Sequence, residues 1–105
     1  MNREIDLAAL RSAAATGMLL WRRHALERML ERGISREEVR FAILDGEAIE
    51  GYSSDTPYPS CLVLHTGEKA LHVVVALDPH SGTCHVITAY RPDAIHFESD
   101  LKTRR

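Results

Sequence analysis

The sequence predicts one α+β domain in which N-terminal helices pack on a four-strand antiparallel meander sheet. Two observations support this fold class. Apolar residues recur at helical spacing in the first half of the chain, and after residue 46 the pattern changes to short valine-rich runs separated by turns. A length of 105 residues, with 45% hydrophobic and 27% charged side chains, suits a single domain. We expect its core over about 19–97, an N-terminal helix in 1–18 and a tail in 98–105.

Three helices are expected before residue 46. The first covers residues 4–15 and ends at Thr16 and Gly17. Its residues available for burial are Ile5, Leu7, Ala8 and Leu10. The second helix covers about residues 19–32. Its apolar stripe comprises Ala25, Leu26, Met29 and Leu30, with Trp21 one turn earlier.

The joint between the second and third helices carries the clearest local signals. Gly33 follows the last periodic residue, where a left-handed C-terminal cap favours glycine. Ser35 and Glu38 have the spacing of a capping box, in which each side chain bonds the backbone amide of the other residue. We therefore expect the third helix to start after Ser35 and to run to about Asp45, before Gly46.

Four strands are expected to follow, over residues 47–52, 61–65, 70–77 and 83–90. Their short connections favour hairpins and therefore an antiparallel meander. One face of the third strand is bulky and is expected to pack on the helices: Leu71, Val73, Val75 and Leu77. His72 lies on the lighter opposite face, which we expect to be partly open to a ligand or partner. The tail is expected to be a short helix that frays.

The charge distribution limits the functions to expect. Net charge is −2, with +1 over residues 1–45 (eight basic, seven acidic) and −3 over residues 46–105 (five basic, eight acidic). Proteins that hold nucleic acid chiefly through phosphate contacts usually have a basic excess, so avid non-specific RNA binding is not expected. No apolar run approaches the roughly 20 residues of a membrane helix, and no signal peptide is recognisable, so we expect a cytoplasmic protein with no membrane partner.

Cys61 and Cys84 lie in apolar, strand-like runs and are expected to be buried free thiols. A disulfide between neighbouring strands is the alternative. The cysteines and the six histidines lack the spacings of metal ligands, such as Cys-x-x-Cys or His-x-x-x-His on a helix. No glycine-rich phosphate loop is present either. We therefore expect neither a metal nor another cofactor.

One candidate polar group lies on the second helix. His24, Arg28 and Arg32 are four residues apart and form a row that borders the apolar stripe. Imidazole transfers protons near neutral pH and guanidinium binds phosphate oxygens, so this row suits phosphate chemistry. The alternative is that the arginines form surface ion pairs, with Glu27, Glu31 or Glu38 as partners, and that His24 is an ordinary edge residue.

A second polar group lies on the predicted strands and comprises His72, His85, Thr88, Tyr90 and Arg91. If Asp78 pairs with Thr83 across the turn, His72, His85 and Arg91 share the lighter face. Thr88 and Tyr90 then point the other way, whereas a slip of one residue reverses this arrangement. The alternative is structural, with a packed, hydrogen-bonded His72 and the Tyr90 ring in the core.

These motifs resemble a widespread bacterial domain-of-unknown-function family. The resemblance covers about residues 20–95. It rests on His24-Ala25-x-x-Arg28-Met29-x-x-Arg32-Gly33-Ile34, Leu71-His72-Val73-Val74 and Thr88-x-Tyr90-x-Pro92-Asp93. That family is similar to the RelE/barnase-like toxin superfamily. The resemblance therefore implies helices followed by a four-strand meander that cradles RNA.

The resemblance further implies a metal-independent endoribonuclease toxin of a bacterial toxin–antitoxin module. Its implied partners are RNA and a cognate antitoxin, with a zinc-finger antitoxin as one candidate type. In the implied reaction the ribose 2′-hydroxyl attacks the adjacent phosphorus. The candidate catalytic residues are His24, Arg28, His72, Tyr90 and Arg91, with His24 or His72 as base or acid and Arg28 or Arg91 as phosphate clamp.

Two other functions remain open from the sequence. One is a non-enzymatic protein-binding or regulatory module that uses the open sheet face or edge, in keeping with the acidic second half of the chain. The other, with less support, is a domain that binds a small molecule on the His72 face.

Overall fold

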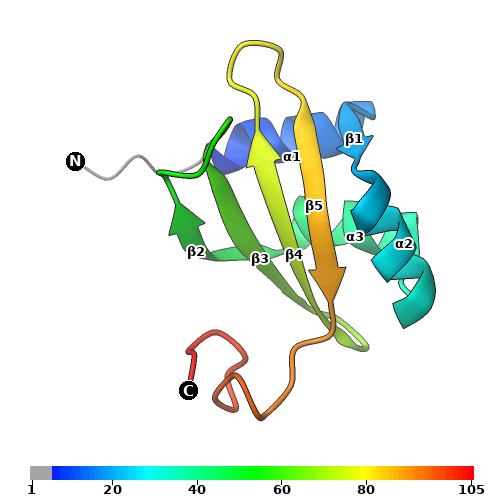
Figure 1. The fold of residues 1–105 in the computed structure, drawn as a ribbon, viewed down its shortest axis with the longest axis vertical. Helices are drawn as coiled ribbons and strands as arrows, with labels where there is room; N and C mark the ends of the chain where they lie inside the picture. Colours follow the sequence, from blue (N-terminus) through cyan, green and yellow to red (C-terminus); the bar gives the residue numbers. More distant parts are fainter. Residues whose placement is uncertain (1–5) are drawn as a thin grey trace.

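A computed structural model describes residues 6–105 as three helices and a five-strand sheet, which confirms the α+β class (Figure 1). Helices α1 and α3 lie behind the sheet in Figure 1, and α2 lies beside β5. None of the described helices is both long and apolar enough to span a bilayer. The elements, in order, are α1 (Leu7–Thr16), β1 (Leu19–Trp21), α2 (Arg23–Arg32), α3 (Arg36–Asp45), β2 (Glu47–Tyr52), β3 (Ser60–Thr66), β4 (Ala70–Leu77) and β5 (Cys84–Tyr90).

The sheet order is β1-β5-β4-β3-β2, so the expectation of four antiparallel strands is wrong. Strands β2 to β5 do form the predicted antiparallel meander. The fifth strand, β1, pairs in parallel with β5, with Leu19 opposite Cys84 and Trp21 opposite Val86. The sheet is therefore mixed.

The second helix begins at Arg23 rather than near residue 19, which corrects the predicted boundary. Arg22 is extended, with φ −65° and ψ 142°, and the preceding three residues form β1. A short apolar run suits a helix or a strand equally well, and here pairing with β5 favours the strand. Trp21 packs against the core from β1 and does not belong to the helical stripe.

The predicted helix ends are confirmed. Gly17 and Gly33 follow α1 and α2 in the left-handed conformation, with φ 78° and 65°, which costs least for glycine. Ser35 caps α3, and its capping box with Glu38 is complete. The predicted first helix included residues 4–6. Residues 4 and 5 lie outside the described residues, and Asp6 is the extended N-cap of α1, which begins at Leu7.

The core lies between the helices and one face of the sheet. As predicted, the bulky face of β4 belongs to it, together with Leu10, Met29 and Ile43 from the three helices. Cys61 and Cys84 are buried and free, which confirms the predicted thiols.

The opposite face of the sheet is not open at His72, contrary to the prediction. The His72 side chain is fully buried, because the chain after β5 folds back over it and packs the Phe97 ring 4.6 Å from the imidazole. This C-terminal segment comprises residues 92–105, and its part 98–105 also differs from the expected fraying helix. It forms turns, held by a bridge between Phe97 and Arg104.

A bulge at Ile87 sets the register of β5. Asp78 does pair with Thr83, through a backbone hydrogen bond of 2.9 Å. The pairing then shifts between Val74 and Val75, so that Tyr90 lies opposite His72 and Thr88 opposite Val74. The predicted orientation of Thr88 and Tyr90 is therefore wrong, because the extra residue turns both onto the face of His72.

Arg91 also departs from the prediction. It follows the end of β5, and its guanidinium reaches Glu38 of α3 instead of sharing the face of His72.

Candidate functional site

A pocket of about 600 Å³ opens beyond the end of β5, between the end of α2 and the C-terminal segment. We call it the arginine pocket. Three arginines from separate parts of the chain lie in its wall, beside an imidazole and a phenol. Its lining residues are Arg32, Tyr90, Arg91, Pro92, Asp93, His96, Phe97 and Arg104.

Each arginine of the pocket is held by at least one neighbour. Arg32, at the end of α2, donates from Nη1 to the carbonyl of Ala89 over 2.8 Å. Arg91 donates from Nη2 to Glu38 over 2.6 Å, and this bond holds the pKa of the Glu38 carboxyl below its usual range. A guanidinium carries five N–H donors, so both side chains are positioned and have donors beyond these bonds, although Nη1 of Arg91 is buried without a partner among the described residues.

Arg104 is fixed by Glu50 of β2. Its Nε and Nη2 donate to the two carboxylate oxygens over 2.9 and 3.0 Å. Burial acts to raise the pKa of Glu50, but the hydrogen bonds from Arg104 and Tyr52 outweigh it and hold the pKa below its usual range. This pair joins the C-terminal segment to the far edge of the sheet. It therefore keeps the third cation at the pocket.

His96 is oriented by Asp93. The Asp93 carboxylate accepts the backbone amides of Ile95 and His96 over 3.0 and 2.9 Å, and it lies 2.9 Å from His96 Nδ1. The hydrogen bond from the His96 amide, followed by that from its ring, lowers the pKa of Asp93. A carboxylate only accepts, so the neutral ring carries its proton on Nδ1 and leaves Nε2 as a proton acceptor.

His72 lies beneath the pocket and supports Tyr90. Its Nε2 is 2.7 Å from the carbonyl of Leu101, which only accepts, so the proton of the neutral ring is on Nε2. Nδ1 therefore accepts the Tyr90 hydroxyl, 3.2 Å away. Burial lowers the pKa of His72 and raises that of Tyr90. Both nitrogens of His72 are occupied, so it acts as a positioning residue.

The structure brings together some of the predicted site residues. Tyr90 and Arg91 line the arginine pocket and His72 lies under it. His24 and Arg28 do not line it: His24 is exposed on α2, and Arg28 pairs with Glu31 over 3.1 Å. Arg32 is the member of the helical row that reaches the pocket, two turns or about 12 Å from His24 along the helix.

Two pocket residues, His96 and Arg104, were not among the predicted site residues. Arg104 lies in residues 98–105, which were expected to fray, whereas His96 lies in the predicted core range and was given no role. The sequence did carry a signal, since Asp93 stands three residues before His96, the spacing of a side-chain cap. The apolar Phe97 among polar neighbours was a second indication that the segment packs on the domain.

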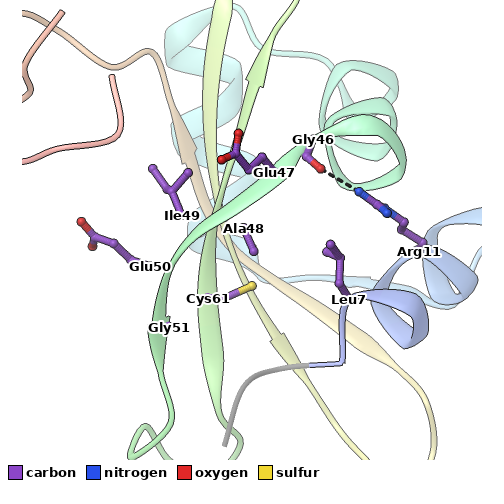
Figure 2. Close-up of a pocket in the computed structure, with 9 residues that line it drawn as sticks. All are labelled: Leu7, Arg11, Gly46, Glu47, Ala48, Ile49, Glu50, Gly51 and Cys61. Carbon is purple, nitrogen blue, oxygen red and sulfur yellow. Dashed lines mark hydrogen bonds between the residues drawn. The ribbon is translucent and has the colours of Figure 1, made fainter. Parts of the chain in front are cut away.

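Another hollow, of about 500 Å³, lies between α1 and β2 (Figure 2). Its cation is Arg11, whose Nη2 donates to the carbonyl of Gly46 over 2.8 Å. Figure 2 shows Leu7 and Cys61 on the same side of β2 as Arg11. No histidine or tyrosine lines this hollow, so it offers less for chemistry than the arginine pocket.

Within residues 6–105, no three side chains of His, Cys, Asp or Glu gather as candidate metal ligands. Searches of the curated proteins and of the solved structures find no match to this chain. A family model does match residues 21–91, which is more than half of the chain and includes Arg32, Tyr90 and Arg91. The chain therefore belongs to the family described as domain of unknown function (DUF4258).

Proposed function

We propose that this protein is a metal-independent endoribonuclease that acts at the arginine pocket. One observation carries the proposal: three guanidinium groups and an imidazole oriented by a carboxylate line the same pocket. Guanidinium groups bind phosphate oxygens bidentately and remain charged, and an oriented imidazole transfers protons near neutral pH. The likeness of the sequence motifs to RelE/barnase-like toxins supports the same chemistry.

The reaction follows from this arrangement. Arg32, Arg91 and Arg104 bind the phosphate and stabilise the charge that builds on its oxygens in the transition state. Nε2 of His96 takes the proton of the ribose 2′-hydroxyl, and the oxygen attacks the phosphorus. The bond to the 5′-oxygen breaks, and this oxygen takes a proton from water. The products are a 2′,3′-cyclic phosphate and a 5′-hydroxyl.

The proposal differs from the sequence hypothesis in the residues that it uses. His96 takes the place of His24 or His72 as the proton acceptor. Arg32 joins Arg91 as a phosphate ligand in place of Arg28. Arg91 keeps its role as a phosphate ligand, and Tyr90 lines the pocket with its hydroxyl bonded to His72. As a toxin, the protein would act on cellular RNA and would be paired with an antitoxin, for which a zinc-finger protein is one candidate type.

The test compares matched variants on induction in bacteria, with growth and RNA integrity as readouts. We expect wild type to slow growth and degrade RNA, and His96→Ala to lose activity by about 10²-fold or more. Arg32→Gln should also lose activity, whereas Arg28→Gln removes the same charge from the same helix and should keep it. His24→Ala is the matched control for His96→Ala, because it also removes an imidazole, and it should keep activity.

Purified protein provides the second readout. It should cleave RNA in the presence of a chelator and leave 2′,3′-cyclic phosphate ends. If His96→Ala remains active and His24→Ala is inactive, the catalytic residues belong to the helical row and the arginine pocket is not the active site. If induction of the wild-type protein neither slows growth nor degrades RNA, the proposal that the protein is a ribonuclease is wrong.

The second candidate function is a non-enzymatic protein-binding module, and one observation favours it. Apolar side chains are exposed at the β1 edge of the sheet and beside it, where Met18, Leu20 and Ile87 are 43%, 46% and 37% exposed. Such exposure is typical of a contact surface when the residues adjoin. This function predicts harmless induction, intact RNA and a co-purifying protein that Leu20→Lys releases.

A further inference from the structure

A third hollow, of about 450 Å³, shares Arg91 with the arginine pocket. We call it the Phe41 hollow. Its wall includes Phe41 of α3, His65 of β3, and Lys69 in the turn before β4. Another hollow, of about 460 Å³, has Arg32, Lys69 and Arg91 in its wall and adjoins both. A continuous groove therefore runs from the arginine pocket past three cations to an aromatic ring.

Phe41 is placed as a stacking surface. It is 56% exposed, which is unusual for a large apolar side chain on a helix that packs on the core. Its ring meets that of His65 edge to face, with the centroids 5.1 Å apart, and Nε2 of His65 lies 3.1 Å from a carboxylate oxygen of Asp45. The Phe41 ring therefore contacts His65 on one side and is exposed on the other.

The turn before β4 fits closely against this support. A Cβ atom on Gly67 would lie 2.9 Å from Cε1 of His65, so the absence of a side chain at this position lets the turn approach the imidazole. His65 is itself only 17% exposed, in contrast to Phe41. His65 is thus closely packed, whereas the exposed surface of Phe41 is not covered by any other part of the described chain.

We propose that the Phe41 hollow binds a nucleobase next to the bound phosphate, so that the substrate is single-stranded RNA. This inference rests on the proposed function, because the phosphate at Arg32 and Arg91 brings the base to Phe41. Bases of a duplex are stacked on each other and are not available to an aromatic side chain, whereas those of a single strand are. Lys69 lies along the path and binds a neighbouring phosphate.

The test uses short 2′-O-methyl oligoadenylate, which the proposed reaction cannot cleave, and an abasic strand of equal length. Binding is measured by fluorescence anisotropy. Stacking predicts that Phe41→Ala weakens binding of oligoadenylate about tenfold. Binding of the abasic strand should be unchanged, and Phe41→Trp should keep the wild-type preference. Leu30→Ala is the matched control, because Leu30 is 84% exposed on α2 and lines neither hollow.

The outcomes separate the two proposals. If Phe41→Ala leaves the preference for oligoadenylate unchanged, or weakens both strands equally, the base site is wrong. Arg91→Gln should weaken the binding of both strands. If it does so while Phe41→Ala has no selective effect, the phosphate site is supported and only the base site is wrong. If wild type binds neither strand, the proposed function fails and the base site fails with it. Circular dichroism and thermal melting establish that each variant is folded.

Discussion

Replacing His72 by phenylalanine tests whether the buried histidine holds the C-terminal segment and Tyr90 in place. The side chain is fully buried and both ring nitrogens are hydrogen-bonded, to Leu101 and to Tyr90. Phenylalanine has a similar shape but leaves both partners without a bond. An unsatisfied buried partner costs about 1–3 kcal/mol. Leu101 and Tyr90 are only partly buried and water reaches them, so we expect a total loss of about 2–3 kcal/mol.

The pH dependence makes this test specific to the imidazole. Burial lowers the folded-state pKa of His72, so the folded protein favours the neutral ring. The stabilisation is then fully present above the unfolded pKa of about 6.5 and is lost as the pH falls from there through the folded pKa. The stability gap between wild type and His72→Phe should therefore be larger at about pH 7.5 than at about pH 5.

Urea denaturation at the two pH values measures the gap. The other histidines are present in both proteins, so their titration cancels in the difference. A gap that stays constant or widens at the lower pH would refute the neutral, buried state of His72. A loss below about 0.5 kcal/mol would refute the role of its hydrogen bonds.

Three further predictions follow from contacts elsewhere. Gly46→Ala should destabilise the fold by about 3 kcal/mol or more in chemical denaturation, because the added Cβ would lie 2.8 Å from the backbone oxygen of Leu64. Burial raises the pKa of Cys61 to about 11 and that of Cys84 to about 12, so neither thiol should react with iodoacetamide in the native protein at neutral pH, as followed by mass spectrometry. Arg104→Ala should raise the pKa of the Glu50 carboxyl in an NMR titration, because it removes two hydrogen bonds to it.

Local chemistry explains which parts of the fold the sequence predicts. The end of α2 and the start of α3 depend on Gly33, Ser35 and Glu38, whose effects act within one helical turn. Strand β4 was predicted to the residue, because its alternation is regular and its turns are short. These features need no knowledge of distant parts of the chain.

The errors in the predicted fold arise where residues far apart in the sequence determine the local structure. The run from Leu19 to Trp21 is a strand only because β5, more than sixty residues later, offers an edge for pairing. The bulge at Ile87 reverses the faces of Thr88 and Tyr90, and no glycine or proline marks it in the sequence. Of the site, Tyr90 and Arg91 were found from the strand exit. His96 and Arg104 were missed, because their roles depend on the C-terminal segment folding back over His72.

The net negative charge of the chain and the proposed RNA substrate are compatible, because salt screens distant charges. At physiological ionic strength the Debye length is about 8 Å, so acidic side chains beyond that distance weaken phosphate binding little. Glu38, Glu50 and Asp93 lie at the groove itself and offset part of its positive charge. The cations along the groove are Arg32, Arg91, Arg104 and Lys69. Three or four phosphate contacts to a single strand predict a slope of about −2 to −3 for log K against log salt concentration. A slope near zero would mean that these cations bind no phosphate, and the proposed site would then lose its basis.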